Sequence, residues 1–395
     1  MSSFSFELID PDLRADEIRR YMINTAGPKR RYFVANLEES SQEGEVFGGF
    51  FRPRDYMKKR EGSSRYIDEW LKASASEVWS PKFLGLDECG IQKLEFQNPA
   101  YAAAHRLGGD PRDYNRVFAI QLNGCPYECS YCFVPRELNK PELGKGKLFS
   151  AEEMLQNFLE AREYYSGRDQ TPLNVVRLTG GEVTSIVPEA IVDVHQEIQL
   201  RGLSNTVYLW IDCNLSTTKY VRLVETDLKR VAKCRNFGMV GCLKAVGDGE
   251  SGKEDFTLVT KAGPEHFKKQ FEALDYFINE IQAYFFVYLV PFVSGTRSAV
   301  RERLTSCADR LREIDPNLPL RTNILQIKHY GPAVENESLA RKEGRPLPWY
   351  DERMVFETWY YEVLPKFYSS EEMQRYRCEV RLRGGGSAKD ATGVL

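Results

Sequence analysis

The sequence lacks the long apolar run that a membrane-spanning helix requires. Such a helix needs about 20 consecutive apolar residues, whereas the longest apolar stretch, residues 283–293, is short and rich in Tyr, Phe and Val. We read this stretch as a buried strand and expect no membrane partner. The first residues, MSSFSFELIDPDLR, carry acids where a secretory signal has basic residues and an apolar core. We therefore expect a cytoplasmic protein.

An excess of charge of one sign is also missing. The formal net charge is −3, from 54 Lys and Arg against 57 Asp and Glu, so no global basic field indicates nucleic-acid binding. Basic residues interleave with aromatic ones within residues 50–60. We expect that stretch to be a solvated surface near a small core; an RNA or anionic-substrate contact is the alternative.

The composition fits a globular chain of ordinary character. Hydrophobic residues make up 42% and charged residues 28% of the 395 residues. This length suits one large α/β domain with additions, or two ordinary domains.

From about residue 116, strand-like runs alternate with helix-like runs. Ser150 and Glu153 form the pattern of a capping box, and Pro188 suits the first turn of a helix. The predicted strands are 116–122, 174–178, 206–211, 238–246, 284–290 and 321–328. The predicted helices are one that begins at Ser150 and those over 188–200, 218–233, 264–281, 297–314 and 352–364, with another from about Ser370.

Six β-then-α units in chain order predict an α/β fold with parallel strands and right-handed crossovers. A doubly wound open sheet shares this pattern; our expectation is a partial (β/α)6 barrel over residues 116–335. Residues 1–115 are expected to form an N-terminal extension of short helices and loops that helps to shape the substrate pocket. Residues 336–383 are expected to form a helical C-terminal extension, and 384–395 a flexible tail. In either fold the active site lies at the carboxyl ends of the strands.

Three of the nine cysteines lie within eight residues. Cys125, Cys129 and Cys132 are spaced four and three residues apart, directly after a predicted strand. Thiolates are the soft ligands that Fe–S clusters prefer. An electron-transfer [4Fe–4S] cluster usually has four protein thiolates, so three leave one iron open to another ligand.

A zinc site is the alternative, and it needs a fourth Cys or His nearby. Cys89 and His105 lie upstream, at spacings unlike those of a zinc knuckle. Cys213, Cys234 and Cys242 are expected to be small buried groups rather than ligands of a second cluster. Cys89, Cys307 and Cys378 are isolated and expected to be structural.

The spacing Cys-x3-Cys-x2-Cys, with Tyr131 before the third cysteine, resembles the signature of the radical S-adenosylmethionine (SAM) superfamily. The resemblance covers roughly residues 116–335. It implies that the open iron binds the amino and carboxylate groups of SAM, and that an electron from the cluster breaks the S–C5′ bond. The resulting 5′-deoxyadenosyl radical abstracts a hydrogen atom from a substrate.

Gly180, Gly181 and Glu182 follow the next predicted strand and are similar to the superfamily's Gly-Gly-Glu element. The resemblance implies that this element contacts the SAM amino group. Two glycines let the backbone approach a ligand closely, and a carboxylate accepts hydrogen bonds from an ammonium. The family often has proline where this chain has Val183.

Asp212-Cys213-Asn214 resembles the Asp-Thr-Asn-Gly stretch of glycyl-radical-enzyme activating proteins. Cys213 stands in place of Thr and Leu215 in place of Gly, so the resemblance implies that only Asp212 and Asn214 contact SAM; a strand-terminating turn is the alternative. Lys244 matches the lysine of an Asp-Leu-Lys stretch in the same proteins, which implies a charge partner for the SAM carboxylate; a solvated strand-end lysine is the alternative. If a thiol relays the radical, we expect Cys213 to face the site. We expect His329 to be packed at the last strand end.

The resemblance implies a radical SAM oxidoreductase or group-modifying enzyme, with a [4Fe–4S] cluster and SAM as cofactors. It also implies an electron donor such as flavodoxin or ferredoxin. The substrate is left open between a small metabolite, a tRNA and a peptide. A glycyl-radical-enzyme activating protein is an alternative, although the long extensions disfavour it. A non-enzymatic Fe–S electron carrier or a zinc-binding protein is the rival from another class.

Overall fold

The structure of the chain is a computed structural model. It describes residues 6–35, 99–114, 116–141, 146–169, 173–247, 249–293, 295–325, 327, 331–346, 351–373, 375 and 377–382. Four features considered above lie outside these ranges: Cys89, His329, the basic stretch at 50–60 and the tail at 384–395.

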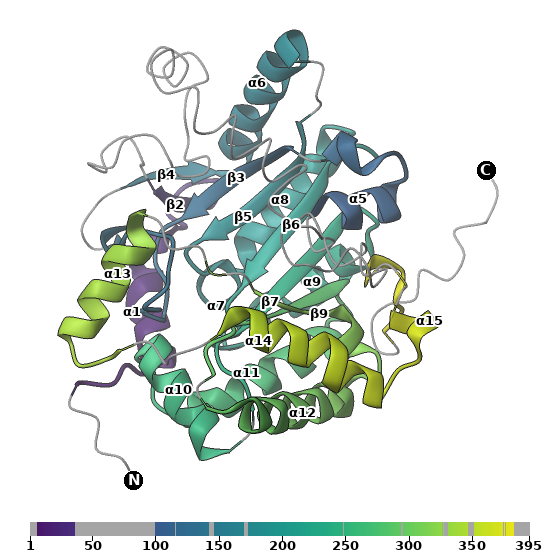
Figure 1. Ribbon diagram of the computed structural model, residues 1–395. Helices are drawn as coiled ribbons and strands as arrows, with labels where there is room; N and C mark the ends of the chain where they lie inside the picture. Colours follow the sequence, from purple (N-terminus) through teal and green to yellow (C-terminus); the bar gives the residue numbers. More distant parts are fainter. Residues whose placement is uncertain are drawn as a thin grey trace.

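The described strands form one open, mixed sheet (Figure 1). Six of them are parallel and neighbour one another in chain order. They are β3 (Arg116–Leu122), β5 (Leu173–Gly180), β6 (Tyr208–Cys213), β7 (Phe237–Leu243), β8 (Phe285–Leu289) and β9 (Thr322–Ile324). A doubly wound sheet reverses its strand order at a switch point, and the order here does not reverse. The predicted α/β class with parallel strands is confirmed.

An antiparallel addition extends the sheet beyond β3. It consists of β1 (Ile23–Asn24), β2 (Arg31–Ala35) and β4 (Gly146–Ser150). β2 pairs with β4 from Arg31↔Ser150 to Ala35↔Gly146 and with β3 at Val34↔Leu122. The expectation of an N-terminal extension made only of short helices and loops is therefore wrong for residues 23–35.

Helices between the parallel strands cover one face of the sheet. They are α6 (Ala151–Asp169), α8 (Glu189–Leu200), α9 (Glu225–Lys233), α11 (His266–Asp275) and α12 (Arg297–Ile314). The predicted capping box opens α6, because Ser150 N donates to Glu153 Oε2 at 2.7 Å and Glu153 N donates to Ser150 Oγ at 3.2 Å. Alternate strand residues such as Leu178, Leu209 and Met239 pack against these helices in the main core.

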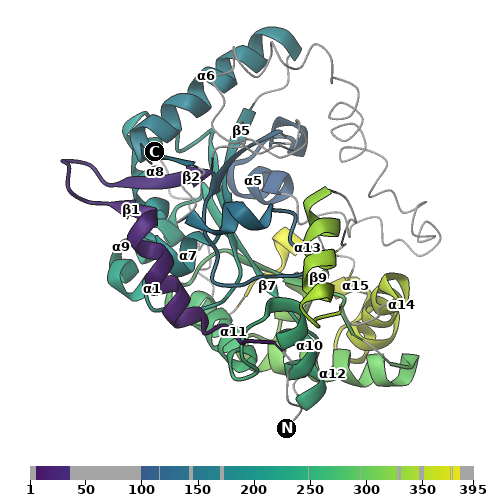
Figure 2. The ribbon, with the colours of Figure 1, turned by 90° about the vertical axis from the view of Figure 1, so that its left-hand side faces the viewer.

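The opposite face, which carries Val175, Trp210 and Val240, is called the inner face below. Helix α5 (Pro99–Leu107) packs on it through Ala100 and Ala103. Figure 2 shows α5 on the side of the sheet away from α8 and α9. Parallel strands covered on both faces carry near-continuous apolar residues, as β7 does with FGMVGCL.

The other described helices lie around the sheet. They are α1 (Pro11–Met22), α7 (Val183–Ile186), α10 (Glu250–Thr260), α13 (Gly331–Lys342), α14 (Glu352–Glu357) and α15 (Ser370–Met373). π-Helical turns follow α11 and α14, at Tyr276–Glu280 and Thr358–Val363. Short 3₁₀ turns are η3 (Pro111–Tyr114), η4 (Arg136–Asn139), η6 (Val221–Val224), η8 (Leu318–Arg321), η10 (Leu364–Lys366) and η11 (Arg377–Glu379). Within the described ranges, no helix has the length and apolar character needed to cross a bilayer.

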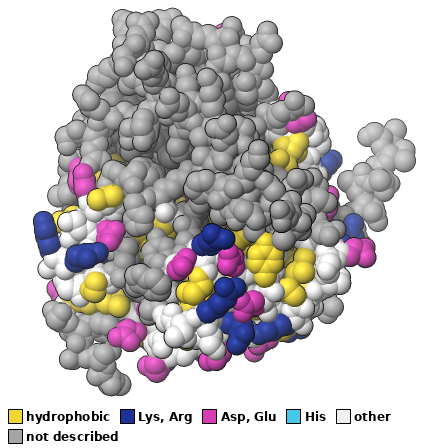
Figure 3. Space-filling model, in the orientation of Figure 1, with side chains coloured by type: hydrophobic (Ala, Val, Ile, Leu, Met, Phe, Trp, Pro, Cys, Tyr) yellow, Lys and Arg dark blue, Asp and Glu magenta, His cyan; other side chains and the backbone are white. Residues whose placement is uncertain are grey.

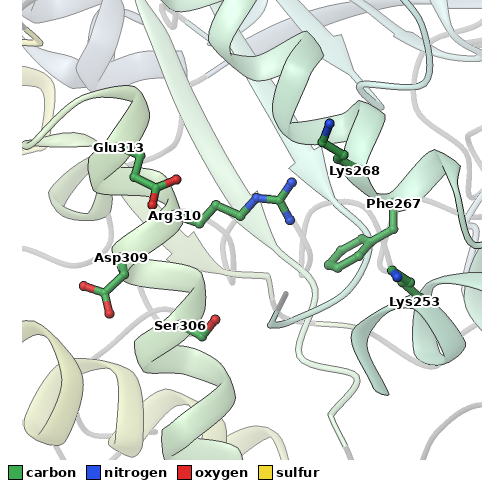
Figure 4. A pocket seen from close by; sticks show the side chains of 7 residues that line it. All are labelled: Lys253, Phe267, Lys268, Ser306, Asp309, Arg310 and Glu313. Atoms are coloured by element: carbon green, nitrogen blue, oxygen red, sulfur yellow. The ribbon is translucent and has the colours of Figure 1, made fainter. Parts of the chain in front are cut away.

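The surface drawn in colour in Figure 3 mixes basic and acidic side chains. A hollow of about 550 Å³ lies between α10, α11 and α12 (Figure 4). Charged groups of both signs line it, together with Phe267 and Ser306: Lys253, Lys268, Asp309, Arg310 and Glu313. It belongs to the helical layer and includes none of the predicted site residues.

Candidate functional site

The three predicted ligands lie on one loop, residues 123–133, that leaves the carboxyl end of β3. We call it the three-cysteine loop. Cys125, Cys129 and Cys132 are free and half-buried, and Cys132 N donates to Cys129 O at 3.2 Å. Burial raises the pKa of all three thiols, to about 12 for Cys129. Cys129 and Cys132 add to the rise at Cys125, so the three groups share one electrostatic environment.

Glu128 fixes the middle of this loop. Its carboxylate forms ion pairs with Arg14 at 2.8 Å, with Lys261 at 3.4 Å and with Arg136. Burial alone raises the pKa of Glu128, but the three cations outweigh it and hold the pKa at about 2. Because these cations come from α1, from η4 and from the segment after α10, the ion pairs tie three parts of the chain to the loop.

Helix α13 and the turn after it hold the loop from another side. Asn336 is buried, and its Nδ2 donates to Cys132 O at 2.8 Å and to Val134 O at 2.9 Å. Arg345 is 1% exposed and donates to the carbonyls of Glu128 and Leu258. Sequence reasoning missed both residues, because nothing in their local sequence indicates a contact with a loop about 200 positions earlier.

Gly180, the last residue of β5, and Gly181 dock this strand end against the three-cysteine loop. Gly181 N donates to Leu122 O at 2.7 Å, and Glu182 N donates to Gly124 O at 2.8 Å. A Cβ on Gly181 would lie 2.2 Å from Gly124 O, and Gly180 has a φ of +89°. The absence of a side chain at these positions thus allows the backbone to approach the three-cysteine loop closely.

Glu182 is 2% exposed, and its carboxylate is engaged by the chain itself. Oε1 accepts from Thr184 N at 3.0 Å, from Ser185 N at 3.2 Å and from Thr184 Oγ1. Oε2 accepts from Asn214 N at 2.5 Å. Burial raises the pKa of Glu182. The carboxylate therefore caps α7 and binds the end of β6.

Asn214 links the end of β6 to the first cysteine. Its Nδ2 donates to Cys125 Sγ at 3.2 Å, and its Oδ1 accepts from Ser216 N at 2.9 Å. Its carbonyl accepts from Gln270 Nε2 at 2.8 Å. Gln270, on α11, is fully buried and also accepts from Lys244 N at 3.0 Å. The strand ends of β6 and β7 are thus held together beside the loop.

Asp212 points to the inner face. Its Oδ2 accepts from Arg177 Nε at 2.8 Å and Nη2 at 2.5 Å, and from Thr179 Oγ1 at 2.6 Å. Its Oδ1 accepts from Trp210 Nε1 at 3.0 Å. The side chains of Arg177 and Asp212 are 28% and 23% exposed although they lie on central strands, so solvent reaches this part of the inner face.

Lys244, Tyr131 and Cys242 form a second polar group at the same end of the sheet. Lys244 is 7% exposed, and its Nζ donates to Tyr131 Oη at 3.1 Å. Tyr131 Oη lies 3.8 Å from Cys242 Sγ, and its ring packs on Phe292. Burial alone lowers the pKa of Lys244, but Cys242, Tyr131 and Cys129 raise it well above its usual value. Lys244 is therefore a buried cation beside the loop.

Cys213 does not face this space, which corrects the expectation made from the sequence. Its thiol lies in the main core, 3.0 Å from Thr184 Oγ1. Successive strand side chains point to opposite faces, and Asp212 on the same strand points to the inner face. Cys242, rather than Cys213, is the additional thiol placed near Tyr131.

The other cysteines that the structure describes do not assemble into a second site. Cys234 directly follows α9, near Gln199, and Cys242 lies near the end of β7. Cys307 is buried within α12 and Cys378 is buried in η11. Of the three cysteines expected to be small buried groups, Cys213 is buried, whereas Cys234 and Cys242 are only half-buried.

Across the residues that the structure describes, no group of three or more His, Cys, Asp or Glu side chains is arranged to hold a metal ion. The thiolates of a four-iron cluster ligate different irons, so they do not need to converge on one point. No protein-family model matches the chain, and no curated protein matches it.

Proposed function

We propose that the chain is a radical SAM enzyme that holds a [4Fe–4S] cluster through Cys125, Cys129 and Cys132. The observation that carries the proposal is the grouping of three thiols on one loop at the carboxyl ends of parallel strands. When bound, the cluster and SAM supply a 5′-deoxyadenosyl radical that removes a hydrogen atom from the substrate.

The residues around the three thiols fit such a cluster. Asn214 and Asn139 direct amide N–H groups at the sulfurs of Cys125 and Cys132. Hydrogen bonds to sulfur and the burial of a cluster are among the features that set its properties. Lys244 adds a positive charge near Cys129, which offsets part of the negative charge of three thiolates.

The proposed scaffold is a partial (β/α)6 barrel made of β3 and β5–β9. Six parallel strands in chain order, with helices over one face, support it. In this arrangement the inner face, with Arg177 and Asp212, lines the substrate pocket. Helix α5 closes the end of the inner face that lies away from the three-cysteine loop.

Two groups are proposed to hold SAM. Lys244 presents a buried ammonium, one hydrogen of which goes to Tyr131, and a buried cation suits a carboxylate. Gly180 and Gly181 form the backbone edge beside the loop. Glu182 supports this edge by capping α7, while Asp212 orients Arg177 on the inner face.

The proposal needs a low-potential electron donor such as flavodoxin or ferredoxin. A cytoplasmic setting, where thiols stay reduced, suits the three cysteines. The substrate class is a small metabolite, a tRNA or a peptide, and activation of a glycyl radical enzyme is a narrower version of the same chemistry.

Anaerobic reconstitution with iron and sulfide, followed by dithionite and SAM, tests the proposal. We expect 5′-deoxyadenosine from the wild-type protein and none from Cys129→Ala. Cys307→Ala is the matched control, because that thiol is buried within α12, and it should retain both cluster and activity. A wild-type protein that carries an intact cluster but yields no 5′-deoxyadenosine would contradict the proposal.

One observation favours a second candidate, a non-enzymatic Fe–S electron carrier. The Cys242 thiol lies 3.8 Å from the hydroxyl of Tyr131, the residue before Cys132, so it is the candidate for a fourth ligand in this alternative. A zinc site closed by the same thiol is a variant of this alternative. In either case Cys242→Ala should lose the metal, whereas the enzyme proposal expects the metal to remain.

A further inference from the structure

We infer that Asn214 raises the reduction potential of the proposed cluster by donating a hydrogen bond to the Cys125 thiolate, and that Glu182 acts by positioning Asn214. The inference rests on the proposed function. It gives Glu182 and Asn214 a role toward the cluster ligand, while Gly180 and Gly181 keep their proposed role toward SAM.

The Asn214 amide is oriented by two contacts. Oδ1 accepts from Ser216 N at 2.9 Å, which leaves Nδ2 to face Cys125 Sγ at 3.2 Å. The side chain is 8% exposed, so water competes little with the sulfur for this donor. The hydrogen bond from Ser216 N and the burial of the side chain therefore fix the direction of the Asn214 N–H group.

Glu182 and Gln270 hold the backbone of Asn214. Asn214 N donates to Glu182 Oε2 at 2.5 Å, and Gln270 Nε2 donates to Asn214 O at 2.8 Å. The other Glu182 oxygen is occupied by Thr184 and Ser185. Because both carboxylate oxygens bind the chain, Glu182 is a positioning residue here.

The effect on the potential follows from charge. Reduction adds one electron to the cluster and its thiolates, and an N–H donor stabilises the more negative state. Hydrogen bonds to the sulfurs are among the factors that set Fe–S potentials. Loss of the donor therefore makes the cluster harder to reduce.

A second amide provides a graded comparison. Asn139 Nδ2 lies 3.8 Å from Cys132 Sγ, a longer contact than the one that Asn214 makes. Hydrogen bonds weaken with distance, so removing Asn139 should change the potential less than removing Asn214.

The experiment is an EPR-monitored redox titration of the reconstituted protein without substrate. Asn214→Ser keeps an oxygen that can accept from Ser216 N but removes the amide donor. We expect its ratio of reduced to oxidised cluster at a fixed potential to fall about tenfold, a shift of about 59 mV to more negative values for one electron. Asn139→Ala should shift in the same direction by less.

Glu182→Gln tests the positioning step. Gln has one acceptor oxygen in place of two, so it must lose either the α7 cap or the contact with Asn214. We expect a shift in the same direction, and the Glu182→Gln/Asn214→Ser double variant should shift no further than Asn214→Ser alone. Additive shifts would overturn the role of Glu182.

The inference about Asn214 and the proposed function can be refuted by different results. An intact cluster whose potential is the same in wild type and Asn214→Ser overturns the inference and leaves the proposed function standing. A wild-type protein that binds zinc, or assembles no cluster, overturns both. If Glu182→Gln does not fold, Asn214→Ser against Asn139→Ala still decides the role of Asn214.

Discussion

Replacing Glu128 with Gln should destabilise the protein through the anchor of the three-cysteine loop. The Glu128 side chain is 6% exposed and neutralises charge on Arg14, Arg136 and Lys261. Gln keeps the shape of the side chain and removes its charge. The substitution therefore resembles protonation of the carboxyl group, and its cost can be worked from the pKa.

The pKa of Glu128 is about 2, against an ordinary value of 4.5, because the three cations outweigh the effect of burial. The difference is about 2.5 units, and one unit corresponds to about 1.4 kcal/mol, so the charged form contributes roughly 3 kcal/mol to the free energy of unfolding. Breaking a buried ion pair by removing one partner typically costs about 3–5 kcal/mol. The value worked from the pKa and the typical cost of a broken buried ion pair agree that Glu128→Gln should lower the free energy of unfolding by about 3 kcal/mol.

The sign of the pH dependence follows from the lowered pKa. The stabilisation is fully present above pH 4.5, where the carboxyl group is ionised in both folded and unfolded chains. It is lost as the pH falls through the folded pKa of about 2. The difference between wild type and Glu128→Gln should therefore shrink in this acidic range.

Urea denaturation of the protein without cluster, at pH 7 and at several values below 4.5, measures this difference. Glu152→Gln is the matched control, because Glu152 pairs with Lys29 and its side chain is 49% exposed. Exposed pairs typically contribute about 0–1 kcal/mol. A loss below about 1 kcal/mol for Glu128→Gln, or equal losses for the two variants, would refute the reasoning.

Two further predictions concern stability. Gly181→Ala should cost about 1–3 kcal/mol, because the added Cβ would lie 2.2 Å from Gly124 O; Gly249→Ala, with open space around its Cβ, should change the urea midpoint little. Burial lowers the pKa of His195 below its usual 6.5, so the stability that neutral His195 contributes is present above pH 6.5 and is lost as the pH falls toward the folded pKa. His195→Gln should flatten the decline in urea midpoint between pH 7 and 5, and an unchanged slope would contradict this.

The sequence predicted the elements whose signals are local. The strand at Arg116–Leu122 and the helix at Arg297–Ile314 have the predicted bounds, because an apolar β-branched run and a long periodic helix are decided by their own residues. β9 ends at Ile324 rather than at residue 328. α10 and α13 were not predicted.

Contacts between distant parts of the chain could not be read from the sequence. Glu128 pairs with Arg14 across 114 positions, and Asn336 reaches Cys132 across 204. Acidic and amide side chains are common on loops and helices, so no local pattern separates these anchors from solvated residues. The addition of β2 and β4 is equally non-local, since two short strands pair across more than 100 positions.

The orientation of Cys213 could have been predicted from the sequence. Alternation along a strand places Cys213 on the face opposite to Asp212, and the same rule places Cys242 and Lys244 together. The role of Glu182 could not have been predicted from the sequence, because it depends on a hydrogen bond from the backbone N–H of Asn214.

The proposed chemistry requires one iron of the cluster that has no protein ligand. EPR spectroscopy of the reduced, reconstituted protein with and without SAM tests this directly, in wild type and in Cys242→Ala. We predict that SAM changes the g-values of the cluster signal in both proteins. A signal that SAM leaves unchanged in wild type, together with loss of the cluster in Cys242→Ala, would show a centre closed by four thiolates and contradict the account.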